Sequence, residues 1–358
     1  MTKKILSDHR RAFGDFEAVD FVNEHEVEQL RRKLDVDVPI DLHWTWEYGS
    51  EVEELRNLYE RGKKGQWNAE TDIDWSAPFP REEWFMPKMG ALMLPSILST
   101  MGVDDASCRE AAWDEFSHLI SQLLHGEQAA MQLCGQLTNA CPIMDQKFYA
   151  GSQVIDEVRH VEVLSKFLQR KMGTLHPIDP TLKILLDMLL EAPTWKLKTL
   201  GMQTLFEGMA VGIFDTIAKA TTNPLLKDII RRVQLDESRH AAFGILSMRQ
   251  VVRESSQEEL EEMEDFAFSI LEALNANQQL DMLRRFGPKY GLDPENVVQS
   301  TLSMPEWPAL NSEIFMHTVM PNLMRLGLIT ERTEPEYRRI GMIHGDRFES
   351  HHELPIAN

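Results

Sequence analysis

One five-residue pattern occurs twice in this chain and constrains its fold more than any other feature. The pattern Asp-Glu-x-Arg-His begins at Asp156 and begins again at Asp236, 80 residues later. A further glutamate stands 30 residues before the glutamate of each copy, which gives the pairs Glu127–Glu157 and Glu207–Glu237. The repetition predicts two structurally equivalent halves that contribute the same side chains to one place.

The spacing within each half is that of a helical hairpin. A glutamate and a histidine three residues apart lie on one face of a helix. A proline turn stands near the middle of each 30-residue interval, at Cys141-Pro142 and at Asn223-Pro224. At 1.5 Å of rise per residue, about a dozen residues up and a dozen back return the chain to the same height. The sequence therefore predicts one cluster inside a helix bundle, formed by Glu127, Glu157, His160, Glu207, Glu237 and His240.

The remaining pattern predicts an all-α chain built around this cluster. Helical periodicity places four long helices at about 110–140, 145–172, 194–221 and 225–252, with a short apolar helix in the connection before Leu190. Two hairpins joined by one long crossover form a ferritin-like four-helix bundle. We expect an irregular N-terminal wrap with short helices (1–85), the bundle (86–253), and a C-terminal helical extension with a loose tail (254–358).

The cluster is predicted to hold two metal ions. Four buried carboxylates would be very costly to desolvate without cations, and two divalent ions neutralise them. A mixed carboxylate and imidazole set favours two iron ions, with Mn/Fe as the alternative, over zinc. Solvated helix-face charges would need polar flanks, whereas the flanks are apolar: Leu123, Leu124, Ala130, Met131, Val154, Val158, Leu205, Phe206, Met209 and Phe243. Two other Glu-x-x-His pairs, Glu115/His118 and Glu349/His352, lack a partner glutamate and are not expected to bind metal.

Residues 110–250 resemble the bacterial di-iron carboxylate superfamily, which includes methane and toluene monooxygenases, ribonucleotide reductase small subunits and aminobenzoate N-oxygenases. The segment from Leu58 to Trp67 also resembles the entry segment of the reductase subunits. The resemblance implies that Glu157 and Glu237 bridge the two metals, and that the other two glutamates are terminal ligands. It further implies that aspartates orient the histidines, although plain surface pairing with arginines stays open; the residues concerned are Asp156, Asp236, Arg159 and Arg239.

No single subfamily matches fully. Leu164 stands where the reductase subunits carry their radical tyrosine. Ala129 and Met202 replace the crosslinked valine and tyrosine of the ligand-binding oxidases. Val233 replaces an additional histidine of the N-oxygenases, and Val211 replaces a threonine of soluble methane monooxygenase. The superfamily is therefore indicated, but not the member.

The predicted activity is that of a di-iron oxygenase or oxidase of the monooxygenase type, with dioxygen as co-substrate. It would hydroxylate, N-oxygenate or desaturate an apolar or aromatic organic substrate, with electrons from a ferredoxin or a flavin reductase. Two glycines in one helix each cost about 1 kcal/mol relative to alanine, so we expect either a substrate pocket or a local π-bulge there; close helix packing is the alternative. The predicted pocket residues are Gly208, Val211, Gly212 and Met131. A ferroxidase and a radical-generating subunit are the rival functions.

The composition and net charge exclude some classes of binding partner. The net charge of −20 argues against nucleic acid and against an anionic membrane surface. No run of 18 apolar residues and no apolar secretory segment is present, and the three cysteines (Cys108, Cys134, Cys141) form no metal-type motif. These features predict a cytoplasmic protein, and we expect a homodimer.

Overall fold

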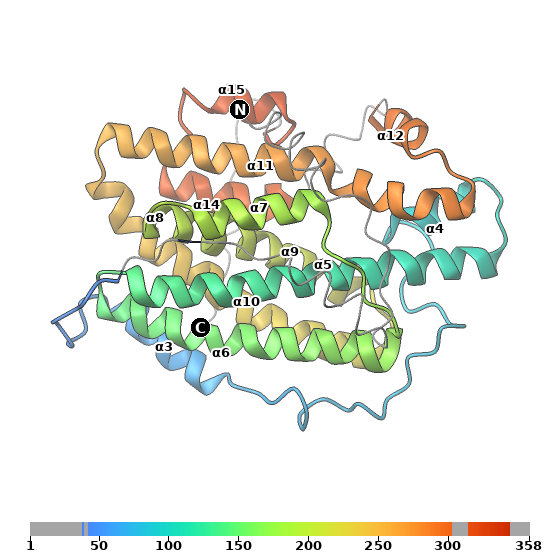
Figure 1. Cartoon of the computed structure of the whole chain (residues 1–358), viewed down its shortest axis with the longest axis horizontal. Helices are drawn as coiled ribbons and strands as arrows, with labels where there is room; N and C mark the ends of the chain where they lie inside the picture. The colour runs from blue at the N-terminus through green and yellow to red at the C-terminus, as the bar shows by residue number, and fades with distance from the viewer. Residues whose placement is uncertain (1–37, 39–41, 303–313, 344–358) are drawn as a thin grey trace.

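The computed structural model describes residue 38 and residues 42–302 and 314–343. Within these ranges the regular secondary structure is helical and contains no β-strand (Figure 1). None of the helices in this part of the chain is long and apolar enough to cross a membrane. The all-α prediction is confirmed.

Four long helical segments form the centre of the molecule, each within five residues of its predicted bounds. The first two are α5 (Asp105–Ala140) and α6 (Met144–Phe167), the latter continued by a π-helical turn, η1 (Leu168–Met172). The third consists of α8 (Trp195–Lys198), a π-helix η2 (Thr199–Phe206) and α9 (Glu207–Ala220), and the fourth is α10 (Pro224–Glu254).

Local side chains decide where these helices begin. Oδ1 of Asp104 accepts hydrogen bonds from the backbone N–H groups of Ala106 and Ser107 and so caps α5. Oδ1 of Asn223 accepts one from the N–H of Leu226, and Pro224 occupies the first position of α10. Proline at this position loses nothing, because the first N–H groups of a helix have no partner within it.

A long crossover joins the two helix pairs. It contains α7 (Pro180–Glu191), which packs against α5 and against the later helix α11 (Gln257–Phe286). The first pair is α5 with α6, and the second is η2 and α9 with α10 (Figure 1). Two helical hairpins joined by one long crossover constitute the predicted ferritin-like arrangement.

The remaining helices pack around this bundle. On the N-terminal side, α3 (Glu53–Lys64) contacts α6 and α10, and α4 (Met93–Thr100) contacts α5. On the C-terminal side lie α11, η3 (Gly287–Tyr290), α12 (Pro294–Leu302), α14 (Val319–Leu326) and α15 (Glu334–Arg339). Most of the first 41 residues of the expected N-terminal wrap, and the end of the expected loose tail from residue 344, lie outside the described residues. The division at 85 and 253 stays a prediction.

Candidate metal centre

The structure brings the six predicted ligand residues together in the middle of the bundle. Each of the four helical segments contributes a glutamate, and α6 and α10 each add a histidine. Glu127 is 6% exposed and Glu207 is 4% exposed, while the other four, Glu157, His160, Glu237 and His240, are 0% exposed. The 30-residue spacing therefore produces the common level that was expected of it.

The ligand atoms form two groups that share two residues. Within each group the atoms lie no more than 4.8 Å from one another. The first group is Glu127, Glu157, His160 and Glu237, and the second is Glu157, Glu207, Glu237 and His240. Because Glu157 and Glu237 belong to both groups, their positions fit the bridging role that the family resemblance implies for them.

Both histidines direct Nδ1 toward the shared carboxylates. Nδ1 of His160 lies 2.8 Å from Oε1 of Glu237, 3.2 Å from Oε2 of Glu127 and 3.4 Å from Oε2 of Glu157. One N–H group cannot satisfy three oxygens, and Oε2 of Glu157 is buried without a hydrogen bond. Nδ1 of His240 lies 3.0 Å from Oε2 of Glu237 and 3.2 Å from Oε1 of Glu157. A cation shared among these atoms fits their positions.

The second nitrogen of each ring is held by an aspartate from the other motif. Nε2 of His160 lies 3.1 Å from Oδ2 of Asp236, and Nε2 of His240 lies 3.3 Å from Oδ2 of Asp156. An imidazole whose Nε2–H donates to a carboxylate leaves the Nδ1 lone pair free for a metal. The aspartates thus face the histidines as the resemblance implied, but the pairing crosses between α6 and α10.

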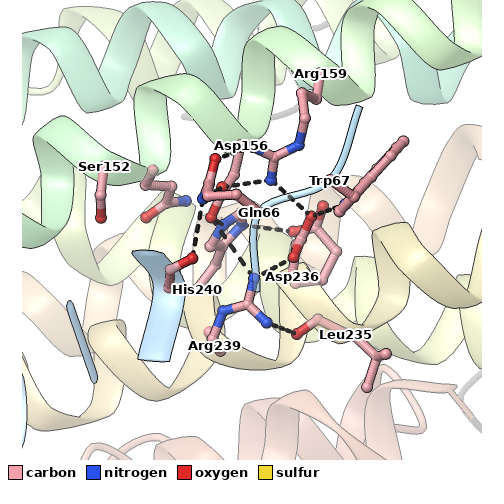
Figure 2. Close-up of polar contacts among 12 residues, drawn as sticks. Gln66, Trp67, Ser152, Asp156, Arg159, Leu235, Asp236, Arg239 and His240 are labelled. Atoms are coloured by element: carbon pink, nitrogen blue, oxygen red, sulfur yellow. Dashed lines mark hydrogen bonds and ion pairs between the residues drawn. The ribbon is translucent and has the colours of Figure 1, made fainter. Parts of the chain in front are cut away.

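Asp236 is held by side chains from several parts of the chain (Figure 2). Its Oδ2 accepts a hydrogen bond from Nε1 of Trp67 at 2.8 Å and one from Nη2 of Arg159 at 3.2 Å. Its Oδ1 accepts a hydrogen bond from Arg239. Although burial opposes ionisation, the hydrogen bond from His160 and the charge of that ring outweigh it and lower the pKa of Asp236.

Asp156 is held in the corresponding way. Its Oδ1 accepts hydrogen bonds from Nη2 of Arg159 at 2.6 Å and from Nε2 of Gln66 at 2.7 Å (Figure 2). The aspartate–arginine pairing that was left open is therefore present together with the histidine contacts. It is not a surface feature, since Arg159 is 7% exposed.

Sequence reasoning did not single out two side chains that contact this centre. Nε2 of Gln153 donates to Oε1 of Glu157 at 2.8 Å and to Oε1 of Glu207 at 3.0 Å. Its position one helical turn before Glu157 was the available signal. Gln66 lies in the entry segment and reaches Asp156 only through the tertiary fold. No helical periodicity predicts that contact.

The pKa shifts in the centre show that its carboxylates require compensation by positive charge. Burial, reinforced by the charge of Glu237, raises the pKa values of Glu127 and Glu207 well above the ordinary range. Burial lowers the pKa of a histidine, but the surrounding carboxylates outweigh it: the pKa of His160 is raised, and that of His240 is raised to about 10. Without metal, the cluster binds protons, and two divalent cations would supply the same compensation.

The other Glu-x-x-His pairs have different surroundings. Glu115 accepts hydrogen bonds from the backbone N–H groups of Met93 and Leu94 at 2.8 and 2.7 Å, and so holds the start of α4. Nε2 of His118 lies 2.8 Å from Oδ2 of Asp179. The pair at 349 and 352 lies outside the described residues.

A cavity of about 250 Å³ borders Glu127 and Glu207, but the predicted pocket residues Gly208, Val211, Gly212 and Met131 do not line it. Met209, Ala210 and Ile213 of the same helix do. The reason is helical phase. A Cβ atom on Gly208 would lie 3.5 Å from Val319, and one on Gly212 would lie 2.6 Å from Ile314.

Gly212 therefore allows close packing against the C-terminal segment, which was the alternative reading, whereas a Cβ atom on Gly208 would make only ordinary van der Waals contacts. The expected helix widening does occur nearby, but as the π-helix η2, which ends at Phe206 before the glycines begin. Not every apolar flanking residue faces the cluster, because Val158 is 46% exposed.

No family model matches the chain, and no curated protein matches it in sequence. Among solved structures, an R2-like ligand-binding oxidase with a non-activated Mn/Mn cofactor is 16% identical, with 79% of this chain and 98% of that chain covered and a TM-score of 0.48. Another, with an aerobically reconstituted Mn/Fe cofactor, is 16% identical over 79% and 98%, with a TM-score of 0.46. A third, after photoconversion, is 17% identical over 79% and 99%, with a TM-score of 0.44.

The fold assignment rests on the helices themselves. In the part of the chain that the structure describes, two helical hairpins and a long crossover surround a buried cluster of four glutamates and two histidines. The chain has the ferritin-like fold, with a centre suited to a pair of metal ions.

Proposed function

We propose that this protein is an oxidoreductase of the monooxygenase type that uses two metal ions and dioxygen to oxidise a small, largely apolar organic substrate. The metals would be two iron ions, or one manganese and one iron. Glu127, Glu157, His160, Glu207, Glu237 and His240 would hold them. When bound, such metals supply the capacity to bind and reduce dioxygen, which no side chain provides.

One observation carries this proposal: the cavity reaches the metal centre. Glu127 and Glu207 belong both to the ligand cluster and to the cavity wall. The wall beside them is apolar, with Ala130, Met202 and Phe206. A substrate placed there lies next to the proposed terminal ligands. An iron-storage site requires a path for ions and does not require an apolar cavity of this kind.

The chain's own residues then have three tasks. The two aspartates keep each imidazole in the tautomer that presents Nδ1 to a metal. The apolar wall excludes water and positions the substrate. Gln153 donates to the two glutamates on either side of it and keeps their carboxylates in place. Electrons would come from a ferredoxin or flavin reductase, and we propose a cytoplasmic homodimer.

Anaerobic loading with ferrous iron, followed by measurement of bound iron and of oxygen uptake, tests the proposal. We expect two irons per chain and stoichiometric oxygen uptake, both lost in Glu157→Ala. Glu162→Ala is the matched control, because this carboxylate lies on the same helix and pairs with Lys166 at the surface. Many irons per chain would support storage instead, and no bound iron would refute the proposal.

A further inference from the structure

One face of α5 forms a wall of the cavity beside the metal centre. The lining residues of this helix recur at intervals of three and four, among them Leu119, Gln122, Leu123, Gly126, Glu127 and Ala130. At 3.6 residues per turn, such positions form one continuous stripe along a helix. Gly126 stands four residues from both Gln122 and Ala130, and so lies within the stripe and directly before the metal ligand Glu127.

Gly126 leaves open space in this wall. A Cβ atom placed on it would have no atom of the described chain within 4 Å, whereas one on Gly212 would lie 2.6 Å from Ile314. Its φ is not positive, so the backbone conformation does not require glycine either. Glycine inside a helix lowers the stability of that helix relative to alanine. Neither close packing nor backbone conformation in the described chain therefore explains Gly126, and its missing side chain enlarges the cavity.

The position of Gly126 distinguishes it from a second open glycine of α5. A Cβ atom on Gly135 would likewise have no neighbour within 4 Å in the described ranges. Gly135 lies nine residues after Gly126, which at about 100° per residue places it on the opposite face of the helix. It does not line the cavity. Gly135 therefore provides a matched control for substitutions at Gly126.

The cavity wall near the metal ligands is apolar and contains further small residues. Ala130 follows Gly126 by about one helical turn, and Ala210 lines the cavity from α9. The aromatic ring of Phe206 lines it from η2. A planar group can approach the backbone of α5 more closely at a glycine than at a residue with a side chain. This part of the wall fits a flat apolar group.

We propose that Gly126 determines the size of the substrate, because it admits a planar aromatic ring system against α5 beside Glu127 that a larger residue would exclude. This rests on the proposed function and adds to it the substrate class, a compact aromatic molecule of up to two fused rings. Gly126 is a specificity-determining residue in this account and takes no part in the chemistry.

The volume of the cavity sets the upper limit of size. A cavity of about 150 Å³ lined by leucine, isoleucine and phenylalanine binds benzene. The cavity here measures about 250 Å³, and on the same scale it holds roughly ten carbon atoms, as in the two fused rings of naphthalene. The side-chain carbons added by Gly126→Leu would reduce this room to about six carbons, or one ring.

Equilibrium dialysis of the anaerobic ferrous protein against benzene and against naphthalene tests the inference, since binding without oxygen involves no turnover. Iron content is measured for each sample, so failure to bind metal is separated from failure to bind the ligand. The unsubstituted protein should bind naphthalene about tenfold or more tightly than benzene, because naphthalene buries more apolar surface.

Substitutions at the two glycines locate this selection. Gly126→Leu should weaken naphthalene binding about tenfold or more and change benzene binding less than about threefold. Gly126→Ala adds one methyl group and should already weaken naphthalene binding about fourfold. The alanine variant decides the matter if the leucine variant loses its iron or its helix content. Gly135→Leu and Gly135→Ala should change the binding of neither ligand.

Two results would overturn the inference while two irons remain bound. One is that the unsubstituted protein binds naphthalene no more tightly than benzene. The other is that Gly126→Ala weakens naphthalene binding no more than Gly135→Ala does, because Gly126 would then not lie against the ligand. Size selection at Gly126 in a protein that binds no iron would instead refute the proposed function and leave the role of Gly126 standing.

Discussion

The crossed pairing of aspartates and histidines makes a prediction that no within-motif arrangement makes. Asp236 supports His160, and Asp156 supports His240. In a His240→Ala background, only the metal position served by His160 keeps its imidazole. Asp236→Asn should then weaken the remaining metal, whereas Asp156→Asn should not. In a His160→Ala background the two aspartates should exchange these effects.

The expected size of the effect combines the general cost of losing such a carboxylate with the contacts of Arg159 in this structure. Loss of a carboxylate that orients a metal-binding histidine typically lowers metal affinity 10- to 100-fold, or about 1.4–2.7 kcal/mol. Arg159 touches both aspartates, at 2.6 Å and 3.2 Å, so removal of the non-partner charge is expected to produce a residual change of a few-fold. The predicted contrast between the two aspartates is thus about tenfold within each background.

The assay is anaerobic titration of each double variant with Co²⁺, followed by its ligand-field absorption and compared with the two single histidine variants. Circular dichroism first establishes that each variant keeps its helix content. Equal losses from Asp156→Asn and Asp236→Asn in both backgrounds would refute the crossed pairing. A reversed pattern would show that each aspartate serves the histidine of its own motif.

Three further predictions concern protons and packing. Metal affinity should rise with pH, because the pKa values of Glu127, Glu207 and both histidines are raised in the metal-free site. Binding of two ions at pH 7 should therefore release as many as four protons, which can be measured in weakly buffered solution. The absence of proton release would contradict this prediction. Burial raises the pKa of Glu115 from 4.5 to about 7, so the folded state binds this proton more tightly and stability falls as pH rises from 4.5 to 7, on the order of 2 kcal/mol given partial exposure; denaturant unfolding of Glu115→Gln should lack this slope, and an equal slope would exclude Glu115 as its source. A Cβ atom on Gly244 would lie 2.7 Å from the backbone of Gln203, whereas one on Gly135 would meet nothing within 4 Å. The Gly244→Ala variant should therefore lose about 1–3 kcal/mol of unfolding free energy, and the Gly135→Ala variant should lose none. Equal effects of the two substitutions would show that α10 does not pack as described.

The sequence predicted the bundle and the six clustered side chains because both follow from periodicity. Helical phase fixes which residues share a face, and the equal 30-residue intervals fix the height at which Glu127 meets Glu157. Gln153 obeys the same rule and was within reach of it. Gln66 and Trp67 were not, because an irregular segment carries them to the aspartates, and only the tertiary fold decides where such a segment lies.

The lining of the cavity could not be predicted from the sequence for a different reason. Gly212 marks a real close approach, whereas a Cβ atom on Gly208 would make only ordinary contacts; their helix has one face toward the cavity and one toward the C-terminal segment. The partner that fills one of them, the segment with Ile314 and Val319, comes about a hundred residues later. Local pattern cannot tell a chamber from a packed interface when the covering element is that remote. The glycine signal was therefore sound, and its assignment to the cavity was not.

The central claim is that Glu157 and Glu237 hold two metals in common. Anomalous diffraction from crystals grown with ferrous iron under anaerobic conditions tests it directly. We predict two iron peaks of similar height within the cluster, each beside one histidine Nδ1, with both carboxylates in contact with both peaks. A single peak, or two peaks that share neither glutamate, would contradict it.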